Sequence, residues 1–241
     1  MVENEAHAEP WRAVVLTLFP DMFPGSLGHS LIGRGLEAGR FTVETLNIRD
    51  FATDRHRSVD DTPSGGGAGM VMKADVLAAA LDHAQDSAPG LPAFCLSARG
   101  RPFKQQDARK LAQGDGAILL CGRFEGIDER LFQRRSIEEI SIGDFVLAGG
   151  ESAALAVLES IVRLLPRILG SEASLLEESF ENGLLEYPQY TRPQKWEGVE
   201  IPEVLTSGNH KRVEDWRRAQ SEEITRERRP DMWAAYGTRK K

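Results

Sequence analysis

The chain has 241 residues, of which 41% are hydrophobic and 28% are charged, and its formal net charge is −7 at pH 7. These values are ordinary for a globular protein and exclude a wholly disordered chain, and the length allows one sizeable core plus a smaller second unit. No apolar run approaches the roughly 20 residues of a membrane-spanning helix. Residues 1–10 are polar and lack the apolar segment of a signal peptide, so we expect a disordered lead-in and a cytoplasmic protein.

The net negative charge argues against a nucleic-acid partner, but the charge is unevenly distributed. Between Ser207 and Lys241 the chain has ten Lys or Arg and six Asp or Glu. A locally basic segment can hold a polyanion, because its attraction to phosphates acts over about 8–10 Å at moderate salt. The same pattern is typical of a solvated helix, so by itself it is weak support for a nucleic-acid partner.

The first two-thirds of the chain alternate short apolar runs with helical patterns, which predicts an α/β unit around a parallel sheet. The third and fourth apolar runs lack polar alternation, as is typical of strands covered on both faces. Cys95 and Cys121 lie in these runs without metal-ligand spacing, so we interpret them as buried core residues of a reducing compartment and expect no metal site. The predicted strands cover residues 13–19, 41–48, 93–97 and 117–121, and the predicted helices cover 74–85 and 105–113.

A further helix is predicted over residues 151–165, where Pro166 stops it. Its apolar positions cover more than one stripe, so we expect it to be buried against the sheet and against a second surface, such as a homodimer partner. Arg163 on this helix has two interpretations. It is either an ion-pair partner of Glu159 one turn away or an arginine that points into a functional site, and the pattern favours neither.

The small and polar residues 170–177 predict a flexible linker. Beyond them the strand patterns stop. Asn209 is a suitable cap for a helix running to about Glu227, and a short helix with Trp233 and Tyr236 is predicted to follow. We therefore expect an α/β domain over residues 11–169 and a small all-helical domain over residues 178–241.

Three glycine-bearing loops, at residues 96–100, 121–126 and 142–150, follow candidate strands. The carboxyl ends of parallel strands form the ligand crevice of such sheets, and glycine lets backbone amides approach a ligand, so the loops favour a nucleotide-like ligand. Neither the G-x-G-x-x-G motif of dinucleotide sites nor the G-x-x-x-x-G-K-[ST] motif of triphosphate sites is present. We interpret the glycine-rich residues 65–69 as a mobile loop that could cover the crevice.

The segment DRHRSVDD at residues 54–61 places three basic side chains next to a pair of carboxylates. It is either a solvated surface turn or a contact region in which arginines hold phosphates and acids meet the edge of a base. A general base at Asp60 or Asp61 is a third interpretation, and the residues alone do not decide among them.

Seven segments in order along residues 13–217 make the chain resemble the bacterial tRNA (guanine-N1)-methyltransferases of the SPOUT class. They are TLFP (17–20), RDFATDRHRSVDD (49–61), GGGAGM (65–70), CGRFEGIDER (121–130), SIGDFVLAGGE (141–151), LLEYPQYTRP (184–193) and LTSGNH (205–210). The resemblance implies a trefoil-knotted parallel sheet with flanking helices and a homodimer whose active sites are shared between subunits. It also implies methylation of N1 of the tRNA guanosine at position 37, next to the anticodon, and a dependence on magnesium.

The resemblance further implies that S-adenosylmethionine is the methyl donor and that the three glycine loops bind it. The implied cofactor contacts are Leu96, Ser97, Gly122, Glu125, Ile142, Gly143, Leu147, Gly149 and Gly150, and the implied tRNA contacts are Arg55, Arg57, Asp60 and His210.

Two residues take the catalytic positions of the family. Arg163 matches its catalytic arginine, which would stabilise negative charge on the guanine O6, and Glu178 stands where the family has an aspartate that acts as general base. Phe124 and Phe145 replace family tyrosines. The residue at the position of the general base differs from that of the family. A catalytically inactive RNA-binding protein of the same fold is therefore the alternative to an enzyme.

Overall fold

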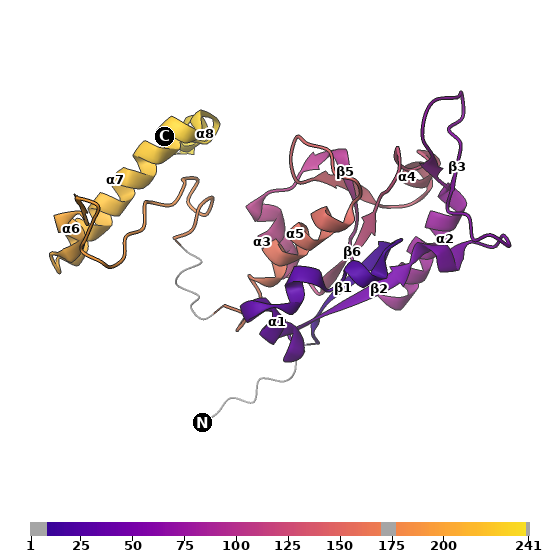
Figure 1. The fold of residues 1–241 in the computed structure, drawn as a ribbon, viewed down its shortest axis with the longest axis horizontal. Coiled ribbons are helices and arrows are strands. Elements are labelled where there is room, and N and C mark those ends of the chain that lie inside the picture. Colours follow the sequence, from indigo (N-terminus) through magenta and orange to yellow (C-terminus); the bar gives the residue numbers. More distant parts are fainter. Residues whose placement is uncertain (1–8, 170–176, 240–241) are drawn as a thin grey trace. The chain divides into compact units, whose positions relative to one another are not determined.

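The computed structural model describes residues 9–169 and 177–239 (Figure 1). Most of the predicted lead-in 1–10 and of the predicted linker 170–177 lies outside the described residues. The chain divides into two compact units, Met1–Gly170 and Ser171–Lys241. We describe each unit by itself.

The first unit is built on a five-stranded sheet in which all neighbouring strands are parallel, in the order β2-β1-β6-β5-β7. This confirms the predicted α/β class with a parallel sheet and flanking helices. The strands are β1 (Trp11–Thr17), β2 (Phe41–Asn47), β5 (Ala93–Pro102), β6 (Gly116–Cys121) and β7 (Glu138–Ser141). The helices are α1 (Ser30–Glu37), α2 (Ala74–Ser87), α3 (Gln105–Ala112), α4 (Arg130–Arg134) and α5 (Glu151–Val162).

Two hydrophobic clusters cover the two faces of the sheet. Along β1, Ala13 and Val15 belong to one cluster, whereas Val14 and Leu16 belong to the other. This alternation follows from the two-residue period of a strand. All of β6 is buried, as the absence of polar alternation in its sequence predicts.

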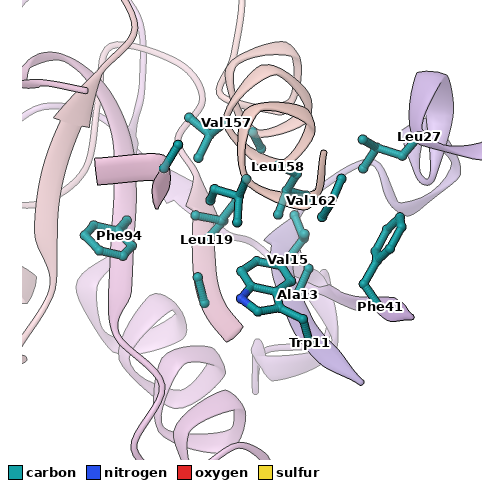
Figure 2. Close-up of a cluster of buried hydrophobic side chains, with 14 of the residues drawn as sticks. Trp11, Ala13, Val15, Leu27, Phe41, Phe94, Leu119, Val157, Leu158 and Val162 are labelled. Carbon is teal, nitrogen blue, oxygen red and sulfur yellow. The ribbon is translucent and has the colours of Figure 1, made fainter. Parts of the chain in front are cut away.

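Helix α5 packs on one face of the sheet, with Val157, Leu158 and Val162 against Val15 and Leu119 (Figure 2). Its six buried apolar side chains form one broad stripe, and all belong to the cluster on this face. They are Ala153, Ala154, Val157, Leu158, Ile161 and Val162. The opposite side of the helix carries the exposed Ser152, Ala156 and Glu159. The apolar pattern of α5 is thus satisfied within one chain and does not require the second surface that the sequence suggested.

Several elements of the first unit have no clear pattern in the sequence. A candidate strand was expected before the third glycine loop, but β7 was not given a range because two of its four residues are glutamates. Helix α1 and the short antiparallel pair of β3 (Asp60–Asp61) with β4 (Val71–Met72) were not predicted. Strand β5 extends to Pro102, so the first glycine loop lies inside a strand, where the pairing with β7 shifts register between Leu96 and Arg101. A Cβ on Gly100 would lie 2.5 Å from the backbone nitrogen of Ile140, and glycine therefore permits this close approach.

The second unit contains α6 (Glu203–Thr206), α7 (His210–Arg228) and α8 (Pro230–Arg239). Asn209 caps α7 as predicted, since its side chain accepts a hydrogen bond from the Arg212 amide at 3.1 Å. The expectation of an all-helical unit is wrong, because β8 (Lys195–Trp196) pairs antiparallel with β9 (Val199–Glu200). Both loop residues of this hairpin, Glu197 and Gly198, have positive φ, which is the backbone of a two-residue hairpin turn.

Candidate functional site

A cavity of about 350 Å³ opens beside residues 95–99 within β5 and beside the segments that follow β6 and β7. This is the edge of a parallel sheet at which ligands bind. All nine residues expected to contact the cofactor line it: Leu96, Ser97, Gly122, Glu125, Ile142, Gly143, Leu147, Gly149 and Gly150. The structure therefore brings together residues that lie far apart in the sequence.

Gly150 joins two walls of the cavity through its backbone. Its amide donates to the carbonyl oxygen of Gly122 at 2.9 Å, and it directly precedes α5. A Cβ at this position would lie 2.8 Å from the Cα of Cys121, so only glycine fits without a backbone shift. Gly150 is thus required by the packing of α5 against the end of β6, independently of any ligand.

Gly149, which lines the cavity, also leaves space for a side chain of the same protein. A Cβ on Gly149 would overlap the guanidinium of Arg123. The glycine therefore makes room for an arginine of the same chain, and its contact with the cofactor stays a prediction.

Arg123 and Glu151 form an ion pair at the cavity that the sequence did not predict. Glu151 is fully buried, and its carboxylate accepts hydrogen bonds from the Thr17 hydroxyl at 2.8 Å and from Arg123 Nε at 2.9 Å. Arg123 also lies over the ring of Phe19, at 4.4 Å from its centroid. In the sequence, Arg123 and Glu151 are recognisable only as charged residues in two glycine-rich motifs, at residues 121–126 and 141–151.

The glycine-rich residues 65–69 lead into a segment that contacts the cavity wall. The Glu125 amide donates to the Met70 carbonyl at 3.0 Å, and the Met72 amide donates to the Gly126 carbonyl at 2.9 Å. Gly69 has a φ of +83°, and a Cβ there would overlap the Glu125 carboxylate. This contact places the glycine segment next to a predicted cofactor residue, while its opening and closing remain a prediction.

Exposed apolar side chains surround the mouth of the cavity. Phe124, Phe145, Val146 and Leu147 are 47%, 52%, 87% and 41% exposed, and all four line the cavity. Flat or branched apolar groups at the mouth of a polar cleft offer surfaces on which a planar ring can lie.

Both thiols near the cavity are buried. The pKa of Cys95 is raised to about 12 by burial and by the nearby Glu139 carboxylate, and burial also raises the pKa of Cys121. Both groups are therefore neutral core residues, as the sequence analysis expected.

Arg163 lies at the opposite end of α5 from the cavity. It is the C-terminal cap of the helix and is half-buried, and it does not belong to the cavity lining. From Ala153, the last residue of the helix that lines the cavity, to Arg163 the helix axis rises by about 15 Å at 1.5 Å per residue. One chain therefore does not bring Arg163 to its own cavity.

Glu178 belongs to the second unit, where it is half-buried. The neighbouring Glu177 is engaged within this unit, because the Tyr187 hydroxyl donates to its carboxylate and Arg217 Nη1 lies 3.4 Å from it. Burial and this hydrogen bond raise the pKa of Tyr187. Glu177 thus has a local structural role.

The predicted tRNA contacts are divided between the two units. Arg55 and Arg57 are exposed in a turn that the Asp54 carboxylate stabilises by accepting the His56 and Ser58 amides, and Arg57 pairs with Asp50 at 2.9 Å. Burial raises the pKa of Asp54, but these hydrogen bonds lower it by more, so the pKa lies below its usual value. Asp60 is half-buried in β3, whereas His210 is exposed at the start of α7 in the second unit.

Within residues 9–169 and 177–239, no three His, Cys, Asp or Glu side chains gather as a metal site would require. Over the same ranges, no helix has both the length and the apolar character needed to cross a membrane.

The chain matches known proteins over nearly its whole length. A family model described as tRNA (guanine-1)-methyltransferase TrmD matches residues 11–235. A tRNA (guanine-N(1)-)-methyltransferase of Mesorhizobium japonicum is 62% identical over 226 residues, which cover 94% of this chain and 97% of the relative. Proteins with the same description from Zymomonas mobilis (59% identity, 95% of this chain and 92% of the relative) and Sphingopyxis alaskensis (62% identity, 92% and 91%) are similar.

Proposed function

Since the chain belongs to the bacterial TrmD family of tRNA (guanine-N1)-methyltransferases, we propose that it transfers a methyl group from S-adenosylmethionine to N1 of guanosine 37 in tRNA. The observation that carries the proposal is the cavity at the sheet edge, lined by all nine residues expected to contact the cofactor. Its volume of about 350 Å³ lies within the range of small-molecule sites. We further propose that the fold carries the family's trefoil knot.

The cavity lining fits S-adenosylmethionine. Backbone groups around Gly122 and Gly143 can bond the polar edge of an adenine and a ribose, while Leu96, Ile142 and Leu147 offer apolar surface to the rings. The Glu125 carboxylate at the cavity can attract the positive charge of the donor. When bound, the cofactor supplies a methyl group already activated by its sulfonium.

The residues of the chain then have to prepare the guanine. N1 of guanine holds a proton and is a poor nucleophile until that proton leaves. We propose that the Glu178 carboxylate accepts the proton as general base. Negative charge then grows on O6, where the guanidinium of Arg163 stabilises it.

The position of Arg163 supports a homodimer with shared sites. Its place at the far end of α5 separates it from Ala153, the last residue of the helix that lines the cavity of its own chain, by about 15 Å of helix. A second copy that presents its Arg163 at this cavity completes the site, as closed symmetric dimers allow.

The proposed substrate base lies in the anticodon loop, where an unpaired base can be turned out of the stack at low cost. We propose Arg55, Arg57, Asp60 and His210 as tRNA contacts, and a dependence of the reaction on magnesium. The exposed rings of Phe124 and Phe145 provide surfaces for the extruded guanine.

A methylation assay on tRNA transcripts tests the function. We expect methyl transfer to a transcript with guanosine at position 37 and none when adenosine replaces it. Titration with S-adenosylmethionine separates the enzyme from the inactive RNA-binding alternative. That alternative would be favoured if the protein bound tRNA but transferred no methyl group at any of the magnesium concentrations tested.

A further inference from the structure

The buried carboxylate of Glu151 and the side chain of Arg123 connect segments that are distant in the sequence. Glu151 begins α5, and its side chain has no exposed surface, while the Arg123 side chain is 20% exposed. One carboxylate oxygen accepts from Thr17 at the end of β1, and the other accepts from Arg123 after β6. A buried carboxylate is tolerated only when it is paired and hydrogen-bonded, so this arrangement strongly constrains all three segments.

Every guanidinium nitrogen of Arg123 is directed to the protein. Nε donates to Glu151 at 2.9 Å, Nη1 donates to the Ala148 carbonyl at 3.2 Å, and Nη2 lies 2.9 Å from Glu151 and 3.8 Å from the Met22 sulfur. The ring of Phe19 covers its other side. Each guanidinium nitrogen of Arg123 thus makes at least one contact within the protein, although the side chain also lines the cavity.

The same side chain spans two walls of the cavity. Its backbone belongs to the loop of residues 122–126, whereas its guanidinium bonds to the segment of residues 148–151 and occupies the space above Gly149. The planar fork of arginine can make these contacts at once, which a lysine cannot.

We propose that Arg123 and Glu151 are positioning residues for the cofactor: their ion pair holds the 122–126 loop and the 148–151 segment at the spacing that S-adenosylmethionine requires. This inference rests on the proposed function. Without the pair the two walls sample other separations, and the apparent affinity falls by the fraction of molecules that remain competent to bind.

The test compares Arg123→Met, Glu151→Met and the double variant by titration with S-adenosylmethionine and by thermal unfolding. Each single variant leaves one charge without its partner and lowers the melting temperature, whereas the double variant removes both charges and recovers stability. Because methionine does not bridge the two walls, we expect the dissociation constant to rise at least about tenfold in all three variants. In steady-state assays the KM for the cofactor rises, while kcat at saturating cofactor stays within about threefold.

Two further variants sharpen the experiment. Arg123→Lys keeps the charge beside Glu151 but not the bond to Ala148, so it should fold well and still bind the cofactor more weakly. Arg135→Met is the matched control, because Arg135 makes a two-pronged pair with Asp82 at 2.6 and 2.7 Å in the same unit and does not line this cavity. It should leave cofactor affinity unchanged.

The outcomes are separable. If the double variant recovers both stability and the parent affinity, or if Arg135→Met weakens binding as much as Arg123→Met, the pair has only a general structural role and the inference is wrong. A parent protein that binds no S-adenosylmethionine would instead overturn the proposed function.

Discussion

The amide of Gly150 donates to the carbonyl oxygen of Gly122 at 2.9 Å, and this bond holds the start of α5 against the end of β6. Both residues line the cavity, so the packing of the sheet and the shape of the proposed cofactor site depend on the same backbone contact.

Replacing Gly150 with alanine tests this dependence. The new Cβ would lie 2.8 Å from the Cα of Cys121, and the backbone has to shift to accommodate it. We expect the free energy of unfolding to fall by about 1–3 kcal/mol, as overpacked cores do. Gly122→Ala is the control for stability, since its Cβ would meet nothing closer than 3.6 Å. Equal denaturant midpoints for the two variants would contradict this account of Gly150.

Mixed dimers test the sharing of active sites. One chain carries Ala98→Trp, which fills the cavity from an exposed lining position, and the other carries Arg163→Ala. Each homodimer should be inactive. If Arg163 acts on the partner's cavity, the mixture regains roughly a quarter of the parent activity, because half of the dimers are mixed and each holds one complete site. A mixture as inactive as its components would place Arg163 in the site of its own chain.

The buried thiols give a prediction that does not depend on function. Because the pKa of Cys95 is raised to about 12, its thiolate fraction at pH 8 is about one in ten thousand. The pKa of Cys121 is raised by the same burial. We expect neither thiol to react with iodoacetamide in the folded protein at pH 8, and both to react in denaturant, as read by mass spectrometry. Rapid labelling of the folded chain would show that the cysteines are not core residues.

Residues whose role depends on local pattern were predictable from the sequence. The apolar runs predicted β1, β2, β5 and β6, and the glycine loops together with the family resemblance predicted the lining of the cavity. The Asn209 cap was predictable for the same reason, since capping involves only neighbouring residues.

Features that depend on distant contacts were missed. Glu151 is an acidic residue in the first turn of a helix, a position favoured by the helix dipole even on the surface. Only the fold shows that it is buried, because its partner Thr17 is 134 residues away in the sequence. The proximity of Arg123 to Gly149 was missed for the same reason, since their positions in the sequence do not reveal that the guanidinium lies next to this glycine.

Basic residues at the start of α7 should contribute to tRNA affinity. Lys211 and Arg212 are exposed next to His210, and neither has an ion-pair partner in the part of the chain that the structure describes. Replacing both with alanine should weaken tRNA binding and lower the salt slope by about one per lost phosphate contact, with cofactor affinity unchanged. Arg218→Ala is the control, because Arg218 already pairs with Glu222 at 3.4 Å. An unchanged salt slope in the double variant would exclude these residues from the RNA interface.

Glu178 is the proposed general base, although the family has an aspartate at this position. The two carboxylic acids have similar pKa values in solution, so the exchange changes mainly the reach of the side chain by one methylene. We expect Glu178→Gln to bind S-adenosylmethionine normally while kcat falls by about a hundredfold or more, because the amide cannot accept the N1 proton. Glu178→Asp should keep or raise the activity.

The adjacent Glu177 provides the matched control for that experiment. Its carboxylate is already engaged by the Tyr187 hydroxyl and by Arg217, so Glu177→Gln should alter the local packing of the second unit and leave kcat within about threefold of the parent. Single-turnover assays at saturating cofactor and tRNA separate the chemical step from binding. If Glu178→Gln turned over at the parent rate while Glu177→Gln or Asp60→Asn did not, the proton would leave to that other carboxylate, and the resemblance would have assigned the base to the wrong residue.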